Sequence, residues 1–215
     1  MGNCIFLRRG APPSSGPQLG DLEPGSLIGI EENGTQVPFL VLMHGYPAAE
    51  RTLVIRRDLY HTIAWNSNGV TTYANSALDI WLNTDYLNLL DADIQAQVST
   101  VVIDYTIGGG NNTLSTLTRK VFALSYTELG LTNSYANIEG TAIPYFDSNT
   151  KRIAYLNEIA NSYWTRSPLT GSIDDRVWTV GQSGIINFNP ASSSFGTRPV
   201  FTLPATMKPI IWEDV

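Results

Sequence analysis

The sequence has few of the residues on which disulfide frameworks and most enzyme mechanisms depend. Its 215 residues include one cysteine and two histidines. A single cysteine cannot form a disulfide within the chain, and it does not indicate whether the protein works in an oxidising or a reducing compartment. Histidine is the side chain that most often serves as a base near neutral pH, and we expect His44, beside Gly45-Tyr46-Pro47, to make a structural hydrogen bond instead. The sequence therefore predicts no catalytic residue, no enzymatic activity and no cofactor.

Charged residues are also scarce. Asp, Glu, Lys and Arg make up 15% of the chain, whereas about a quarter is usual in soluble domains. The net charge is −6 and no stretch concentrates the 13 basic residues, which argues against binding to nucleic acid or to an anionic membrane. No apolar run approaches the ~20 residues that a membrane span needs. The order of residues at the N-terminus does not match a signal peptide, so we expect a soluble, unprocessed chain.

Residues 1–25 differ from the rest of the chain. Proline, glycine and serine dominate residues 10–17, and residues 23–25 add a second break, so neither helix nor central strand is expected there. We predict an extended N-terminal arm over residues 1–25 and a single domain over residues 26–215. The arm has an apolar tip and two arginines that suit attachment to a partner: Ile5, Phe6, Leu7, Arg8 and Arg9. A leader without fixed structure is the alternative that the sequence leaves open.

The first half of the domain predicts strands followed by short helices. Asn33-Gly34 lies between two apolar runs and predicts a hairpin, and residues 52–56 predict a third strand. Residues 76–98 predict two short helices, with Ser76 and Asp91 as N-terminal caps.

The second half predicts strands and long loops. We expect a strand at 101–106, a flexible loop at 108–112 and a buried strand at 119–125. Short helical pieces are expected near 144–146 and 156–161. The closing strands are expected at residues 163–166, 177–180, 185–188 and 200–203, with residues 181–184 forming a hairpin turn. Strands, helices and then a meander of strands indicate an α+β fold.

Two arginine motifs near the end of the chain predict buried polar contacts. Arg166 follows Tyr163-Trp164-Thr165, and Arg198 precedes Pro199. A buried arginine must be paired, so we hypothesise that Arg166 forms an ion pair with Glu128 or Asp79. We expect a structural clasp that joins the closing strands to the helices, formed by Asp79, Trp81, Glu128, Trp164, Arg166 and Arg198.

Catalysis by paired carboxylates and metal binding are weaker interpretations. Asp79, Asp104 and Glu128 could in principle form a two-carboxylate site. Two pairs, at 91 and 93 and at 174 and 175, could hold calcium, but helix capping and turn solvation explain them more simply. We therefore predict no metal site. The aromatic, Asn and Ser residues of the stretch 187–195 favour adaptable recognition, so we expect a ligand-binding loop there that includes Asn187, Phe188, Asn189 and Phe195.

Four of these segments, in the same order, resemble the motifs of one family. Residues 73–83 (YANSALDIWLN) resemble its S-x-(I/L)-(R/D)-x-W-L-N helix, and residues 120–128 (KVFALSYTE) resemble its K-x-F-L-L-S-x-x-E strand. Residues 163–168 (YWTRSP) and 196–200 (GTRPV) are similar to its W-(L/T)-R-S-P and G-(V/I)-R-P-(A/V) motifs. The chain is thereby identified as a member of the DUF6273 family of Firmicute bacteria and their bacteriophages, over roughly residues 26–205.

The resemblance implies a C-type-lectin-like domain with short helices and antiparallel strands. Lectins of that fold that bind sugar through calcium carry paired Glu/Asn-Pro and Trp-Asn-Asp motifs. Here only Asn189-Pro190 is similar and no Trp-Asn-Asp occurs, which argues against calcium-dependent sugar binding.

The first functional reading is a non-enzymatic structural protein of a bacteriophage virion, acting as surface decoration, fibre or host-adhesion module. It would be assembled in the bacterial cytoplasm, lie on the virion surface and bind capsid or tail proteins through residues 1–25. The expected partners also include a host surface glycan or protein and further copies of the chain. A bacterial surface or secreted module that binds carbohydrate or protein is the alternative. A formylglycine-generating enzyme is a distant third, because Cys4 alone cannot supply the reactive cysteines of that chemistry.

Overall fold

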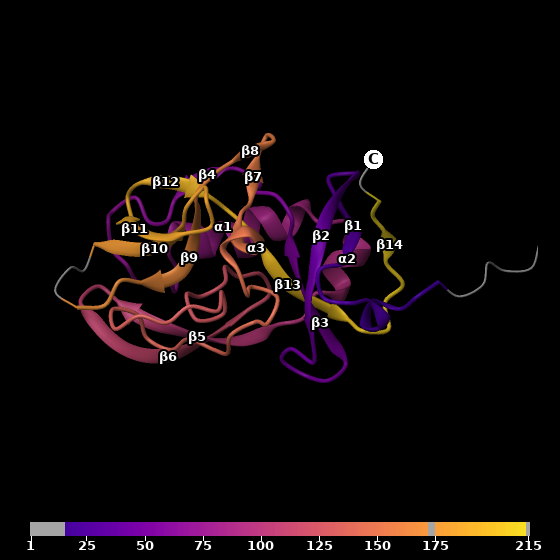
Figure 1. The fold of residues 1–215 in the computed structure, drawn as a ribbon, viewed down its shortest axis with the longest axis horizontal. Helices are drawn as coiled ribbons and strands as arrows, with labels where there is room; N and C mark the ends of the chain where they lie inside the picture. The colour runs from indigo at the N-terminus through magenta and orange to yellow at the C-terminus, as the bar shows by residue number, and fades with distance from the viewer. Residues whose placement is uncertain (1–15, 172–174, 214–215) are drawn as a thin grey trace, which may run out of the picture.

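The computed structural model describes residues 16–171 and 175–213. The chain forms an α+β domain with many strands and a few short helices. Most strands lie in two five-stranded sheets, and four others form two separate hairpins. In Figure 1 the two sheets occupy opposite ends of the long axis. The strand β13, at the edge of the first sheet, lies near the middle of the molecule. The expected α+β class with largely antiparallel strands is confirmed.

The first sheet is antiparallel, with the strand order β13-β3-β2-β1-β14. Its strands are β1 (Leu27–Glu32), β2 (Thr35–His44), β3 (Arg51–Arg56), β13 (Val200–Pro204) and β14 (Ile210–Ile211). Asn33 and Gly34, which join β1 to β2, have positive φ angles of 50° and 74°, as a two-residue type I′ turn requires. The predicted hairpin and the predicted third strand are confirmed.

The second sheet has the strand order β11-β10-β9-β12-β4, in which only the β9–β12 pair is parallel. Its strands are β4 (Thr62–Ala64), β9 (Tyr163–Pro168), β10 (Arg176–Val180), β11 (Ile186–Pro190) and β12 (Ser194–Gly196). All the predicted closing strands are present, although the strand predicted at 185–188 runs from Ile186 to Pro190. The turn predicted at 181–184 joins β10 to β11, where the amide of Gly184 donates to the carbonyl of Gly181 at 2.9 Å.

Residues 76–98 form the predicted short helices with an irregular link between them. The helical elements are α1 (Ala77–Trp81), a π-helical turn (Leu82–Tyr86), a 3₁₀ turn (Leu87–Leu89) and α2 (Ala92–Gln97). Ser76 Oγ accepts from the amide of Asp79 at 3.1 Å, and Asp91 Oδ1 accepts from the amide of Asp93 at 3.0 Å. Both predicted caps are therefore confirmed, since each satisfies an amide that has no partner inside its helix.

The buried strand predicted at 119–125 is wrong. β5 (Val101–Gly108) and β6 (Asn111–Arg119) form a hairpin that ends at Arg119. After it the chain is buried but forms no regular ladder. Side chains satisfy its amides instead: Asn83 Oδ1 accepts from Lys120 and Val121 at 3.2 Å, and the Tyr73 hydroxyl accepts from Ala123 at 3.1 Å. Phe122 alone makes a β-bridge, to Val200 of β13, with backbone hydrogen bonds of 3.0 Å in both directions. A single bridge does not extend into a strand.

Two further predictions for the middle of the chain have different outcomes. The loop predicted at 108–112 is present, as a tight turn between β5 and β6 in which three consecutive glycines have positive φ angles. A Cβ at Gly108 would lie 1.9 Å from the carbonyl oxygen of Thr71, so only glycine fits there. The helical pieces predicted near 144–146 and 156–161 are absent from the described residues. The chain forms α3 (Asn149–Arg152) and a hairpin of β7 (Tyr155–Leu156) and β8 (Ile159–Ala160).

The structure describes the predicted arm only from residue 16. Leu19 is fully buried, its amide donates to the carbonyl of Met207 at 2.7 Å, and Gly20 bonds to Ala205 at 2.8 Å. Residues 19–21 form a short 3₁₀ turn against the domain. The part of the predicted arm from Leu19 onward therefore belongs to the domain, and the predicted tip at residues 5–9 lies outside the described residues.

One large apolar core joins both sheets and the helices. The largest fully buried side chains include Trp65, Trp164, Arg166, Tyr73, Tyr86 and Phe39. Arg166 is the charged side chain in this set, and it marks a polar centre inside the apolar core. Within residues 16–171 and 175–213, no helix has the length and apolar character to cross a membrane.

Candidate functional site

Arg166 lies on β9 and has no exposed surface. Its Nη1 and Nη2 donate to the two carboxylate oxygens of Glu128 at 2.6 Å and 2.8 Å, and its Nε and Nη1 donate to the carbonyls of Asp104 and Ala123 at 2.8 Å and 2.9 Å. Burial alone would lower the pKa of Arg166, but the Glu128 carboxylate raises it above its ordinary value. The hypothesis of a buried acidic partner is confirmed, with Glu128 and not Asp79 as that partner.

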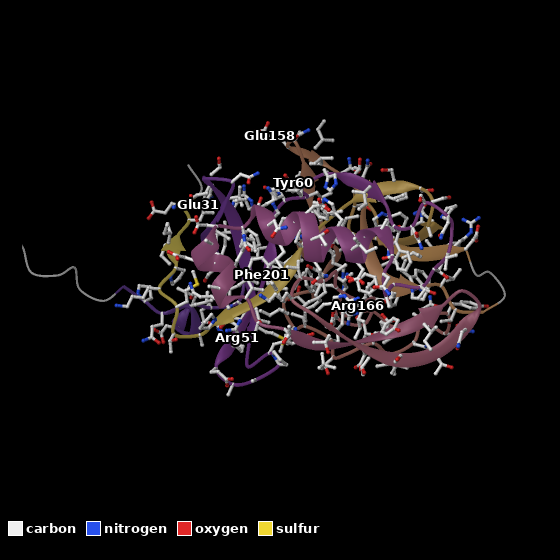
Figure 2. The ribbon with its side chains drawn as sticks, turned by 180° about the vertical axis from the view of Figure 1, so that it is seen from behind. Glu31, Arg51, Tyr60, Glu158, Arg166 and Phe201 are labelled. Carbon is white, nitrogen blue, oxygen red and sulfur yellow. The ribbon has the colours of Figure 1, made fainter. Side chains whose placement is uncertain are left out.

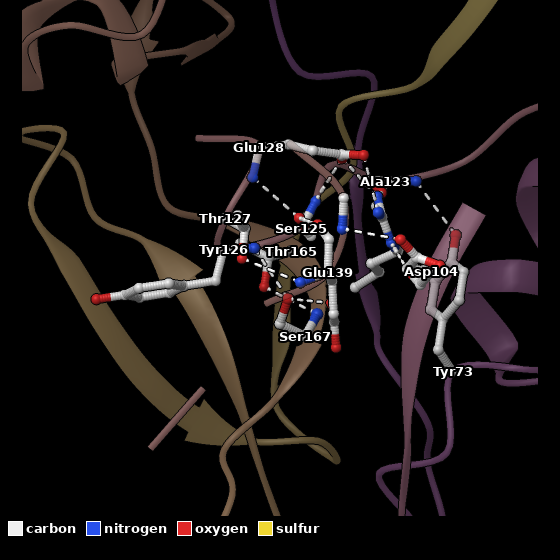
Figure 3. A network of polar contacts seen from close by, with 12 residues as sticks. Tyr73, Asp104, Ala123, Ser125, Tyr126, Thr127, Glu128, Glu139, Thr165 and Ser167 are labelled. Atoms are coloured by element: carbon white, nitrogen blue, oxygen red, sulfur yellow. Dashed lines mark hydrogen bonds and ion pairs between the residues drawn. The ribbon is translucent and has the colours of Figure 1, made fainter. Parts of the chain in front are cut away.

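A second buried carboxylate, Glu139, lies beside this ion pair (Figure 3). Its Oε1 accepts from the amide and hydroxyl of Thr106 at 2.8 Å and 2.6 Å. Its Oε2 accepts from the hydroxyl of Ser167 at 2.5 Å. Burial raises the pKa of Glu139, and the charge of Arg166 acts in the opposite direction. Two acids and one arginine thus share a site with almost no access to water.

Tyr46 covers this network from the loop between β2 and β3. Its hydroxyl donates to Glu128 at 3.1 Å, and its ring stacks on Phe122 with centroids 6.3 Å apart. Burial raises the pKa of Tyr46, and the negative charge of Glu128 adds to the effect. On another side, a Cβ at Gly140 would lie 2.9 Å from Glu128 Oε1. Tyr46 and Gly140 enclose Glu128, and Glu139 is fully buried as well. The arrangement therefore suits holding segments together more than acting on a substrate.

The three acids considered for a two-carboxylate site have separate structural partners. Asp79 accepts from Nε and Nη2 of Arg119 at 2.7 Å each. Asp104 Oδ2 accepts from the amide of Gly140 at 3.2 Å, and Glu128 is held by the Arg166 side chain. Asp79 thus joins α1 to the end of β6, while Glu128 joins the 120–128 segment to β9. The six residues of the predicted clasp therefore belong to several contacts, not to one.

The two predicted tryptophans lie in different clusters. Trp81, on α1, packs against Tyr60, His61 and Tyr86, with ring centroids 4.4–5.5 Å away. Trp164, on β9, donates from Nε1 to the carbonyl of Ile63 at 2.9 Å and so ties β9 to β4. Both residues are parts of the packing between elements, as expected of a clasp.

Arg198 is 4% exposed, and no carboxylate among the described residues pairs with it. Its Nε and Nη2 donate to the carbonyls of Arg56 and Arg57 at 3.1 Å each. Its Nη1 donates to the Tyr163 hydroxyl at 3.2 Å and to the carbonyl of Arg152 at 3.5 Å. Arg198 therefore joins the end of β3 to α3 and β9.

The predicted ligand-binding loop at 187–195 is not a loop. Asn187, Phe188 and Asn189 lie on β11, an edge strand of the second sheet, and Phe195 lies on β12. Phe188 packs edge-on against Trp178, and Asn189 donates to Thr179 at 2.8 Å. Strands β9 and β10 separate β11 from β12, so the four residues do not form one contact surface. The strand predicted at 185–188 already included Asn187 and Phe188, and the same alternation of apolar and polar residues continues it to Pro190.

A cleft of about 800 Å³ lies between the β1–β2 hairpin and residues 145–158. Its lining includes the apolar and aromatic side chains of Leu27, Val37, Leu40, Tyr60, Tyr145 and Tyr155. Its polar groups come from Arg56, Arg57, Asp58, Thr150, Lys151, Asn157, Glu158 and Arg198. Figure 2 shows Glu158 at the tip of the projecting β7–β8 hairpin, beyond Tyr60. A cleft of this size with aromatic walls and mixed polar groups is the kind that binds ligands.

Metal binding has no support in the described part of the chain. There, no group of three or more His, Cys, Asp or Glu residues could hold an ion. Asp91 caps α2 and Asp93 lies in the first turn of this helix, so helix capping explains this pair of acids. The other calcium candidate includes residue 174, which lies outside the described residues. His44, at the end of β2, bonds to Thr52 at 2.9 Å and to the carbonyl of Leu22 at 2.7 Å, which confirms its expected structural role.

A comparison with family models assigns the chain to one family. The family described as "Domain of unknown function (DUF6273)" matches the chain over residues 49–205. The chain belongs to this family. Comparisons with curated proteins and with solved structures give no match.

Proposed function

We propose that this chain is a non-enzymatic recognition domain that binds a surface glycan in the cleft between the β1–β2 hairpin and residues 145–158. The observation that carries the proposal is the contrast between sealed acids and an open cleft. Glu128 and Glu139 have no exposed surface, whereas the cleft offers about 800 Å³ lined by tyrosines and polar side chains. Recognition of a ligand requires an open cleft of this kind. Acid–base catalysis would require that a substrate reach the acids, and these acids are buried.

The lining of the cleft suits a sugar chain. Aromatic faces such as Tyr145 and Tyr155 can pack against the apolar faces of sugar rings, and both line the cleft. Planar or branched polar groups such as Asn157 and Asp58 can bond to hydroxyls. The charged groups of the lining are largely paired already: Arg57 with Asp58 at 3.1 Å, and Lys151 with Asp147 at 2.8 Å. A neutral or weakly charged ligand therefore fits better than a polyanion.

We further propose that the domain serves on a bacteriophage virion and has a C-type-lectin-like fold. This part rests on the resemblance of the four sequence motifs. Decoration and host adhesion are both compatible with it. Attachment would use the residues before Leu19, because Leu19 itself is buried in the domain. Several copies on one particle would strengthen weak binding through avidity. A bacterial surface or secreted module with the same cleft is the alternative, and it would not depend on the N-terminal residues.

A glycan array probed with the full chain tests the recognition role. Tyr155 is 44% exposed on the β7 strand, so Tyr155→Ala should weaken binding about fivefold or more without unfolding the domain. Leu114→Ala is the matched control, because Leu114 is 46% exposed on β6 and lies outside the cleft. The proposal is overturned if no glycan binds, or if both variants bind like the parent.

The virion role has a separate test. Removing residues 1–15 deletes none of the described residues. The truncated chain should keep its glycan binding but fail to incorporate into particles. Normal incorporation of the truncated chain contradicts attachment through these residues and favours a free bacterial module.

A further inference from the structure

We propose a second binding site, for an uncharged saccharide, in the pocket between Tyr126-Thr127 and the loop at 131–138. The pocket has a volume of about 410 Å³, which suits one or two sugar rings. It shares no lining residue with the larger cleft. The site therefore goes beyond the proposed function and stands on its own observations.

The pocket is lined without a single charged side chain. Its polar groups are hydroxyls and amides, contributed by Thr127, Thr132, Asn133, Ser134 and Asn137. Its apolar groups include Tyr126, Leu131 and Ile138. The larger cleft, in contrast, has arginine, lysine, aspartate and glutamate in its lining. An ionic ligand would lose its hydration in the smaller pocket and find no opposite charge there, so the chemistry selects a neutral ligand.

Two hydroxyl groups of the loop are free to bind. Thr132 and Ser134 are exposed, and neither hydroxyl has a hydrogen-bond partner within the residues that the structure describes. Adjacent sugar hydroxyls both donate and accept, as do these side chains. Ile138, 73% exposed at the rim, offers apolar surface to a sugar ring.

The loop is already fixed in position. Asn137 Nδ2 donates to the carbonyl of Asn112 at 2.6 Å and to Thr106 Oγ1 at 3.1 Å. The carbonyl of Tyr135 accepts from Trp178 Nε1 at 3.2 Å and from the amide of Thr170 at 2.9 Å. A ligand would therefore pay little ordering entropy in this loop, which favours binding by a small pocket.

The wall behind the loop is rigid as well. The Tyr126 ring packs on Trp178 with centroids 4.7 Å apart. Figure 3 shows its side chain pointing away from the buried network that surrounds Glu139. Its backbone amide donates to Ser167 at 2.9 Å, within that network. The buried network thus fixes one wall of the pocket.

Amide chemical shifts of the full-length ¹⁵N-labelled chain test this site. The probes are galactose, mannose and N-acetylglucosamine, each added alone. We expect saturable shifts at residues 126–138 for at least one sugar. The dissociation constant should stay the same between about 0.05 M and about 0.5 M NaCl, because no charge pair is screened.

Two threonine variants complete the test. Thr132→Val removes one free hydroxyl without changing the shape of the side chain and should weaken binding about fivefold. Thr116→Val is the matched control, since Thr116 is also an exposed threonine but lies on β6 outside the pocket. The inference is overturned if no sugar shifts residues 126–138, or if the two variants bind alike. Shifts confined to the larger cleft would overturn this site and leave the proposed function intact.

Discussion

Two buried arginines close this domain in different ways. Arg166 and Arg198 both follow a threonine near the end of the chain, and their exposed fractions are 0% and 4%. Arg166 has a carboxylate partner, Glu128, at 2.6 Å and 2.8 Å. The recorded partners of Arg198 within the described residues are backbone carbonyls and the hydroxyl and ring of Tyr163. Similar sequence motifs therefore produce an ion pair in one place and a set of neutral hydrogen bonds in the other.

The difference predicts unequal sensitivity to mutation. If Arg166 is lost, the Glu128 charge stays buried without its cation, and a buried unpaired charge is very unfavourable. If Arg198 is lost, only neutral acceptors remain, and each costs the smaller penalty of an unsatisfied carbonyl. The same substitution at both positions isolates the effect of the carboxylate.

The largest effect is expected for Arg166→Met. Methionine keeps much of the side-chain volume but leaves Glu128 unpaired, so the free energy of unfolding should fall by about 3–5 kcal/mol at neutral pH. Urea denaturation followed by tryptophan fluorescence measures the change. The double variant Arg166→Met, Glu128→Gln should recover about 1 kcal/mol or more, because it removes the stranded charge. A single variant as stable as the parent would show that the ion pair is not what holds β9.

Arg198→Met should have a smaller effect, about 1–3 kcal/mol. The carbonyls of Arg56, Arg57 and Arg152 lose a donor, but no charge is stranded. Urea denaturation gives the stability, and hydrogen exchange at residues 56–60 and 152–155 should show faster local opening. If Arg198→Met proved as harmful as Arg166→Met, the presence of a carboxylate would not explain the sensitivity of these nodes.

Glu139 provides a pH-dependent test of the same polar centre. Burial raises the pKa of Glu139 above its ordinary value of 4.5, so the folded chain holds this proton more tightly than the unfolded chain. Its contribution to stability is complete below pH 4.5 and is lost as the pH rises through the folded-state pKa, by about 1.4 kcal/mol per unit of pKa difference. Urea midpoints measured at intervals above pH 4.5 should fall less steeply for Glu139→Gln. Glu158→Gln, at an exposed hairpin turn, is the control and should follow the parent curve.

Local signals in the sequence were sufficient for part of this fold. Asn33-Gly34 predicted the first hairpin because the two residues tolerate positive φ angles. Ser76 and Asp91 predicted the helix starts because their side chains accept from nearby amides. The partner of Arg166 was narrowed to Glu128 or Asp79, since a buried arginine requires an acid and few acids lie within the recognised motifs. The structure was needed to select Glu128.

Contacts between distant parts of the chain explain the failures. Residues 120–125 have an apolar pattern that predicts a strand, but only Phe122 pairs with a strand, at Val200. The amides of Lys120, Val121 and Ala123 bond to the side chains of Asn83 and Tyr73 instead. No local rule reveals such partners. Glu139 was overlooked, although it is the only charged residue between Glu128 and Asp147 in the sequence. The overall composition does not show this isolation. The position of one acid within a long uncharged stretch was the local signal for a buried carboxylate.

The smallest effect is expected where the same carboxylate chemistry lies at the surface. Asp147 accepts from Lys151 at 2.8 Å, as Glu128 accepts from Arg166, but the side chains of Asp147 and Lys151 are 60% and 41% exposed. Water solvates both groups when the contact is broken, so Asp147→Asn should leave the urea midpoint within experimental error of the parent. Glu128→Gln makes the equivalent change from carboxylate to amide in the buried pair and should lower the midpoint clearly, because buried Arg166 then loses the carboxylate to which its guanidinium bonds directly. Equal effects of the two substitutions would mean that burial does not set the importance of an ion pair in this domain.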